Sequence, residues 1–180
     1  MKRIAFLKRR IEIYLKKGQL LKGDEYTKLE KPFLAKARKN FTTANILMKI
    51  SGNEKLKKTL SLTSDFEMYD WVIIVAYYSV YVSALGALAR LGFKSKSHAA
   101  TLAILEYNYV YQKRGLEIRD IEKLSKAYTL SEGLINKLIQ TKIRRETAQY
   151  DATPSISREN ALSSLEDADE FITRIEEILS

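Results

Sequence analysis

The sequence predicts an all-α fold, an up-and-down bundle of four to five long helices with an N-terminal helical extension. Only 7 Gly and 2 Pro occur among 180 residues, which disfavours the many tight turns of a β-sandwich or barrel. Apolar residues recur every three or four positions along most of the chain, without an alternating strand pattern or internal repeat. The length suits one domain, which we divide into a basic helix with connector (residues 1–31) and a bundle (residues 32–180).

The first expected helix covers residues 3–17. Ile4, Leu7 and Ile11 share one apolar face, opposite a face rich in Lys and Arg. Gly18 can end this helix, because glycine adopts the left-handed conformation of a helix C-terminus without strain.

A second amphipathic helix is expected over residues 32–50, after a connector over residues 18–31. Pro32 suits its first turn, where the missing N–H costs nothing. Residues 53–64 are expected to form a short helix or a loop.

The central helix is expected to begin near Ser64 or Asp65, to be apolar on all sides, and to end at Gly92. The segment from Trp71 to Ala89 is 19 residues long and uncharged. That is close to the ~20 residues that span a bilayer. Tyrosines and serines in its middle favour a helix buried inside a bundle, with a membrane span as the alternative.

Residues 93–96 are expected to form a basic turn, after which Ser95 or Ser97 caps a helix ending near Gly115. Asp120 can cap a further helix.

That further helix is expected to continue to residue 150, with a bend near Gly133, and to be followed by a loop over residues 152–155. Ser157 can cap the last helix, with Glu159 in its first turn and an acidic outer face.

Composition excludes several kinds of site. The absence of Cys excludes disulfides, thiolate catalysis and Cys-ligated zinc, and the single His98 excludes a two-histidine metal site within one chain. No glycine-rich phosphate loop is present. The sequence therefore indicates neither a metal nor a cofactor.

The net charge of +9 is unevenly distributed. Residues 1–50 hold 14 basic and 4 acidic residues, whereas residues 151–180 hold 2 and 8. A pI near 9.5 suits a polyanionic partner such as a nucleotide or RNA, and a solvated Lys-rich surface is the alternative. Because the N-terminus carries no apolar run followed by a cleavage site, we expect a cytoplasmic protein without a membrane anchor.

Three segments are candidates for chemistry. Tyr77, Tyr78 and Tyr81 in the central helix are core aromatics or, alternatively, the stacking wall of a nucleotide pocket. The segment from Lys94 to His98 precedes a helix, where free amides and the lysines Lys94 and Lys96 can bind an anion. An ordinary capped turn with a structural histidine is the alternative there.

The third candidate segment contains Arg144, Arg145 and Tyr150 near the end of a helix. The two arginines either offset the helix dipole or clamp a phosphate, which guanidinium groups bind bidentately.

Together these segments resemble the HEPN domain family (higher eukaryotes and prokaryotes nucleotide-binding) over roughly residues 33–179. The stretches that carry the resemblance are AYYSVYVSALGALARLGF, the KSH turn and the Arg-x-x-Ala-x-Tyr-Asp segment from Arg145 to Asp151. The resemblance implies a helical bundle, usually a symmetric dimer, that binds nucleotides or acts as a metal-independent RNase. It also implies a nucleotidyltransferase-type protein partner, as in toxin–antitoxin systems.

The RNase members carry an Arg followed, after four to six residues, by a His. Here Tyr150 stands in that place, with four residues intervening after Arg145. A Tyr with a pKa near 10 is a poor general base at neutral pH. We therefore expect a nucleotide- or RNA-binding homodimer, with a metal-independent RNase (candidates Arg145, Tyr150 and His98) or a protein-interaction module as alternatives. The expected binding residues are Lys94, Lys96, His98, Arg144, Arg145 and Tyr150, with Tyr77, Tyr78 and Tyr81 as pocket wall.

Overall fold

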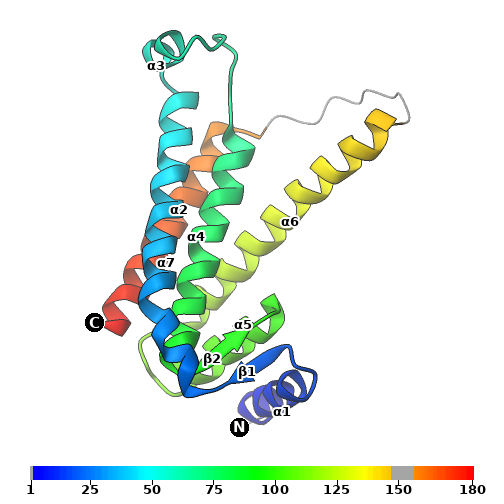
Figure 1. Cartoon of the computed structure of the whole chain (residues 1–180), viewed down its shortest axis with the longest axis vertical. Helices are drawn as coiled ribbons and strands as arrows, with labels where there is room; N and C mark the ends of the chain where they lie inside the picture. The colour runs from blue at the N-terminus through cyan, green and yellow to red at the C-terminus, as the bar shows by residue number, and fades with distance from the viewer. Residues whose placement is uncertain (1, 147–155) are drawn as a thin grey trace.

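A computed structural model of the chain describes residues 2–146 and 156–180 and confirms the all-α fold (Figure 1). The α-helices are α1 (Lys2–Lys16), α2 (Glu30–Ser51), α3 (Glu54–Thr59), α4 (Tyr69–Arg90), α5 (His98–Leu105), α6 (Ile118–Glu146) and α7 (Arg158–Leu179). A 3-10 helix η1 (Asp24–Leu29), a π-helix η2 (Glu106–Tyr111) and the strands β1 (Leu20–Lys22) and β2 (Phe93–Ser95) complete the described elements.

Helix α4 is the centre of the bundle and packs against α2, α6 and α7. Its most apolar 18-residue window has a mean hydropathy of 1.9, enough for a membrane span, yet 78% of that window is buried inside the protein. This is the expected core helix, with one correction. Trp71 and Tyr78 are 45% and 44% exposed, so one stripe of α4 faces solvent.

The start of α4 differs from the expectation. The helix begins at Tyr69 rather than near Ser64 or Asp65, and residues 54–59 form the short helix α3. Buried Lys57 donates to the Ser64 carbonyl oxygen at 2.6 Å. The Lys57 ammonium therefore satisfies a carbonyl oxygen that a longer α4 would have bonded within the helix.

The small antiparallel sheet was not predicted from the sequence. Strand β1 lies in the expected connector, and β2 replaces the expected basic turn at residues 93–96. Leu20 pairs with Ser95, and Lys22 pairs with Phe93. Strands of three residues are too short to display the alternation by which strands are recognised.

Other expected boundaries are confirmed or adjusted. Gly18 and Gly92 follow α1 and α4 with φ values of 64° and 73°, in the left-handed region. Ser97 and Ser157 cap α5 and α7 through their hydroxyl oxygens. Helix α6 begins two residues before Asp120 and runs unbroken through Gly133, so the bend expected there is absent.

Helix α7 is fastened to its neighbours by charge as well as by its apolar stripe. Arg38 of α2 donates to Glu176 at 2.8 and 2.6 Å and to Asp169 at 3.0 Å. Lys123 of α6 pairs with Asp167 at 3.0 Å and with Glu170 at 2.6 Å. Much of the acidic face of α7 is thus used within the fold.

Candidate functional site

The single histidine of the chain lies where three helices meet. His98 is the first residue of α5, and its ring stacks on Tyr128 of α6 with centroids 3.9 Å apart and planes inclined by 14°. Tyr77 and Tyr81 of α4 lie at 6.3 and 5.7 Å from the imidazole centroid. We call Tyr77, Tyr81, His98 and Tyr128 the His98 cluster.

The helix periodicity builds the tyrosine side of this cluster. Tyr77 and Tyr81 are four residues apart, so they share one face of α4, and their rings are 5.8 Å apart and nearly parallel. The ring of Tyr78 lies 5.2 Å from that of Tyr77 on the exposed edge of the same helix. The cluster is therefore continuous with an aromatic surface open to solvent.

Both ring nitrogens of His98 are buried without a hydrogen bond to any described residue. Burial lowers the pKa of His98 from its ordinary 6.5 to about 4, opposed by the negative charge of Glu132. The imidazole is therefore neutral at pH 7, with one N–H donor and one lone-pair acceptor. Unpaired buried groups of this kind are uncommon and call for an explanation.

Tyr77 and Tyr128 stay protonated at neutral pH. Burial raises the pKa of Tyr77 well above its ordinary value. The Tyr128 hydroxyl donates to Glu132 at 3.0 Å, and this bond raises the pKa of Tyr128. The cluster thus offers hydrogen bonds and stacking rather than a strong base.

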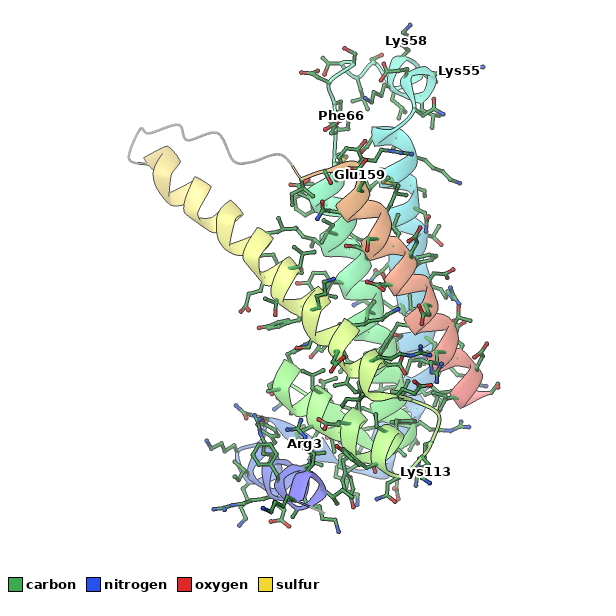
Figure 2. All side chains as sticks on the ribbon, turned by 180° about the vertical axis from the view of Figure 1, so that it is seen from behind. Arg3, Lys55, Lys58, Phe66, Lys113 and Glu159 are labelled. Atoms are coloured by element: carbon green, nitrogen blue, oxygen red, sulfur yellow. The ribbon has the colours of Figure 1, made fainter. Side chains whose placement is uncertain are left out.

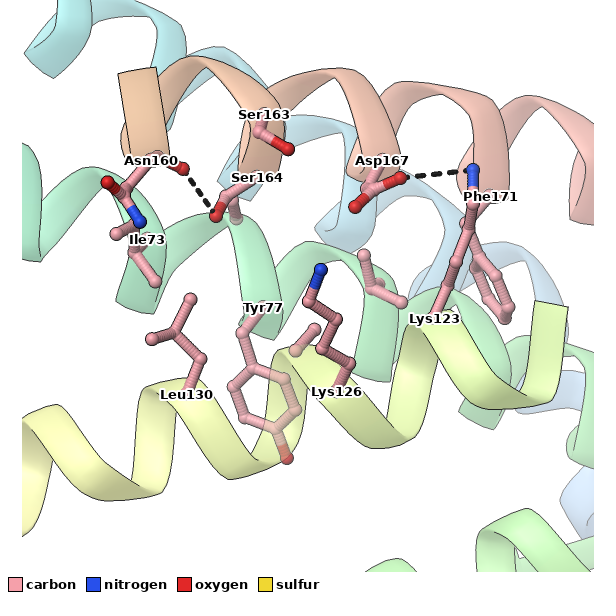
Figure 3. Close-up of a pocket in the computed structure, with 13 residues that line it drawn as sticks. Ile73, Tyr77, Lys123, Lys126, Leu130, Asn160, Ser163, Ser164, Asp167 and Phe171 are labelled. Atoms are coloured by element: carbon pink, nitrogen blue, oxygen red, sulfur yellow. Dashed lines mark hydrogen bonds and ion pairs between the residues drawn. The ribbon is translucent and has the colours of Figure 1, made fainter. Parts of the chain in front are cut away.

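A pocket of about 100 Å³ with polar and apolar lining lies beside the cluster, between α4, α6 and α7 (Figure 3). Tyr77 belongs to both, since its ring lines this pocket as well as the cluster. The side chain of Lys126 reaches from α6 toward α7 and has no ion pair among the described residues. The remaining polar lining consists of Lys123, Asn160, Ser163, Ser164 and Asp167.

The structure separates the residues expected to bind phosphate. Tyr77, Tyr81 and His98 come together, with Tyr78 beside them, whereas Lys94 lies over the ring of Tyr26 at 5.9 Å from its centroid. The backbone N–H of Lys96 donates to the carbonyl oxygen of Gln19 at 2.8 Å. Both lysines therefore lie along the small sheet next to α1.

Arg144 and Arg145 lie in the last turn of α6, and Tyr150 lies outside the described residues. Seventeen residues separate Tyr128 from Arg145, which corresponds to about 25 Å along the helix axis. Figure 1 shows α6 diverging from α4 toward this end. One chain therefore does not bring Arg145 to its own His98.

Sequence reasoning missed Tyr128 and Glu132 as site residues, and it missed Lys126. Tyr128 falls within the helix expected after Asp120, where no motif singles it out. Its spacing of four from Glu132 is the available signal, because residues at that separation meet on a helix. Nothing local indicates that Tyr128 faces His98, since that contact depends on how α5 and α6 pack.

Comparisons with known proteins agree with this architecture. The family model described as "HEPN domain" matches residues 51–178. The chain is also similar to a UPF0332 protein from Archaeoglobus fulgidus, with 25% identity over 127 residues, covering 71% of this chain and 89% of the relative. The His98 cluster and the pocket beside it lie within the matched residues, whereas α1 and β1 lie outside them.

Proposed function

The chain belongs to the HEPN domain family, and on that premise we propose that it binds a nucleotide or RNA at the His98 cluster. The observation that carries the proposal is the neutral imidazole of His98, whose two ring nitrogens form no hydrogen bond with a described residue while its face is stacked. A nucleobase offers both a stacking face and polar edges, and so complements such a group.

Tyr128 covers His98 and is itself half-buried. We propose that a base inserts between the Tyr128 ring and the imidazole, so that Tyr128 moves outward and stacks on the second face of the base. The base would then keep the stacking contact with the imidazole, and an oxygen of the adjoining ribose or phosphate would accept the imidazole N–H in the plane of the ring. Base–aromatic stacking typically contributes ~1–3 kcal/mol, which can offset the loss of the internal pair.

The adjacent pocket supports a phosphate or ribose subsite. Lys126 supplies a positive charge that forms no ion pair with a described residue, and Ser163 and Ser164 supply hydroxyl groups. Its volume of about 100 Å³ lies below the ~300–1,000 Å³ of pockets that enclose a small molecule. This size favours part of an RNA strand lying over the surface more than a fully enclosed free nucleotide.

A metal-independent RNase with a variant active site is the second candidate. The separation of Arg145 from His98 along α6 means that such a site requires a second copy of the chain. Exposed Trp71 and Tyr78, seven residues apart on α4, are an apolar surface consistent with the homodimer that we propose.

We also propose a nucleotidyltransferase-type protein partner in a cytoplasmic, toxin–antitoxin-like or regulatory system. The acidic residues of α7 that form no ion pair with a described residue, such as Glu166 and Glu177, support a contact with a basic partner surface. Co-purification with a neighbouring nucleotidyltransferase-type protein is the expected result. A purely structural module would bind that partner without binding a nucleotide or RNA.

The proposal is tested by titrating single-stranded RNA and mononucleotides into the parent protein and the variant Tyr128→Leu. Loss of the ring should weaken binding about 5-fold or more, in line with a stacking contribution of ~1 kcal/mol. Phe66→Leu, beside α3 at the far end of the molecule (Figure 2), is the matched control and should bind as the parent does. Equal affinity of the parent and Tyr128→Leu would exclude the cluster as the binding site.

RNA cleavage separates the two candidates. Parent and Arg145→Ala protein are incubated with mixed RNA in chelator. The binding proposal predicts no cleavage by either protein. Cleavage by the parent that disappears in Arg145→Ala would instead establish the RNase.

A further inference from the structure

Helix α1 is the most basic element of the protein, and it precedes the residues that match the family model. Residues 2–17 contain seven basic side chains and one acidic side chain. A helix that only completed the fold would need its apolar stripe but not this charge. The question is therefore what the charged face contacts.

The position of α1 is fixed by contacts on its inner side. Leu7 and Tyr14 are buried in the core. The Arg3 guanidinium binds the buried carboxylate of Glu106 through two hydrogen bonds of 2.7 and 2.6 Å. Such bidentate pairs orient both groups, so α1 presents its outer face in one orientation.

The outer face of α1 is a basic ridge. Lys2, Arg9 and Lys16 recur every seven residues, two helical turns, directly opposite the buried stripe. Lys17 follows at the end of the helix. All four side chains are exposed and make no ion pair with a described residue.

The small sheet extends this ridge toward the His98 cluster. The bond from the Lys96 N–H to Gln19 places Lys96 next to the segment that follows Lys17. Lys96 is exposed and precedes His98 by two residues. A continuous line of positive charge therefore runs from α1 to the start of α5.

An aromatic side chain lies along one edge of the ridge. Phe6 is 47% exposed, and the guanidinium carbons of Arg3 and Arg10 lie 5.4 and 5.6 Å from its ring centroid. Phe6 also lines an open hollow of about 310 Å³ between α1, α5 and α6. This hollow is large enough for a nucleobase, whereas the pocket beside Tyr77 is not.

The hollow borders the His98 cluster along the seam between α5 and α6. Ala99 and Ser125 line it. Ala99 directly follows His98, and Ser125 precedes Tyr128 by one helical turn. The basic ridge, the hollow and the stacked imidazole are therefore consecutive along one side of the molecule.

We infer that α1 and Lys96 form a docking surface for single-stranded RNA that leads the strand to the His98 cluster. The ridge of Lys2, Arg9, Lys16 and Lys17 holds phosphates, and Phe6 stacks one base at the hollow. Positive charge interleaved with an exposed aromatic ring favours a single strand, whose bases are free to stack. This inference rests on the proposed function, because it assigns a second contact region to the same RNA.

The experiment measures the affinity for a fluorescein-labelled 20-nucleotide oligouridylate by anisotropy at several KCl concentrations. The test variant is Arg9→Gln/Lys16→Gln/Lys17→Gln, whose substituted side chains are all exposed. The matched control is Lys49→Gln/Lys55→Gln/Lys58→Gln, which removes the same charge around α3, at the opposite end from α1 (Figure 2).

The test variant should bind at least 10-fold more weakly at low salt. The slope of log K against log [KCl] should become shallower by about 2, since each phosphate contact on single strands contributes about 0.7. The control variant should keep the slope of the parent. Equal losses in both variants, or no loss in the test variant, would overturn the docking surface.

Two further readouts separate this inference from the proposed function. Phe6→Leu should weaken oligonucleotide binding and leave mononucleotide binding unchanged, whereas Tyr128→Leu should weaken both. If mononucleotide binding depends on Tyr128 but RNA affinity is unchanged by the α1 substitutions, the proposed function is supported and the docking surface is excluded. If the test variant changes the sedimentation coefficient instead, the ridge takes part in a contact between copies of the chain, which also overturns the inference.

Discussion

The two sides of the bundle differ in how completely their buried polar groups are hydrogen-bonded. On the side of α2, α4 and α7, Ser79 and Ser83 donate to helix carbonyl oxygens, and Arg38 binds two carboxylates. On the side of α1, α5 and α6, both ring nitrogens of His98 and the hydroxyl of Ser131 are buried without partners among the described residues. Because unpaired buried groups cost stability, the second side is where the molecule retains capacity for a ligand.

Charged faces show the same contrast. The sequence predicts an acidic outer face for α7, and four of its carboxylates, Asp167, Asp169, Glu170 and Glu176, pair with Arg38 or Lys123. Of the basic residues of α1, only Arg3 forms an ion pair with a described residue. A charged helix face therefore indicates a binding partner only through those of its residues that form no ion pair within the fold.

The largest expected effect lies on the side of α2, α4 and α7. Phe171 of α7 is 1% exposed in the core. The substitution Phe171→Ala should lower the free energy of unfolding by about 3–5 kcal/mol, because it removes buried apolar area and leaves a cavity. Urea denaturation monitored by circular dichroism measures this loss. A loss below about 1 kcal/mol would mean that α7 is not part of the core.

The next effect belongs to the His98 side and depends on pH. His98 is neutral when folded, with a pKa of about 4, and it titrates near 6.5 when unfolded. Below pH 6.5 the unfolded chain binds the extra proton, so stability falls as the pH falls from 6.5 to about 4. The difference between the two pKa values corresponds to a loss of about 3 kcal/mol in the free energy of unfolding once the pH has fallen to about 4.

Carboxylates also titrate in this pH range, so the contribution of His98 is measured as the difference in free energy of unfolding between two proteins. The free energy of unfolding of the parent and of His98→Gln is measured between pH 7.5 and 4. Glutamine keeps polar atoms at the site but binds no proton there. The gap between the two proteins should therefore change steadily on acidification. A gap that stays constant would show that His98 is hydrated or paired in solution.

Sequence patterns sufficed for the parts of the molecule that depend on local chemistry. Helix periodicity located the long helices, and capping residues such as Ser97 and Ser157 marked two helix starts. Periodicity and capping residues did not predict β2 or the start of α4. At both places, hydrogen bonds to residues distant in the sequence replace bonds within a helix. Spacing cannot reveal such bonds, because they exist only after the chain has folded.

The site was predictable in part for the same reason. Tyr77 and Tyr81 share a helix face by spacing alone, and the helix start at His98 follows from its capping serine. The stack of His98 on Tyr128 joins two helices, and no local rule brings Tyr128 there. The lysines Lys94 and Lys96 were expected to accompany His98, yet the pairing of β1 with β2 aligns them with α1.

A smaller loss of stability is expected when an ion pair is removed, and it should differ between the α1 side and the α7 side of the bundle. Glu106 is 4% exposed, so Arg3→Ala leaves an almost buried carboxylate without its partner and should cost about 1–3 kcal/mol. Arg38 and its partners are partly exposed, so Arg38→Ala should cost about 1 kcal/mol or less. Hydrogen exchange should show faster exchange in α1 for Arg3→Ala only. Equal protection of α1 in both variants would mean that its apolar stripe alone holds it.

The smallest expected effect is that of Tyr128→Phe, which removes the hydroxyl of Tyr128 and keeps its ring. The hydroxyl donates to Glu132 at 3.0 Å on an exposed part of α6. Its removal in Tyr128→Phe should therefore cost only about 0.5 kcal/mol of stability, near the lower end for a hydrogen bond. The phenyl ring can still stack on His98, so affinity for RNA should change less than about 2-fold, whereas Tyr128→Leu should lose about 5-fold or more. If Tyr128→Phe instead weakens binding as much as Tyr128→Leu, the hydroxyl or the Glu132 that it orients contacts the ligand, and stacking is not what the cluster contributes.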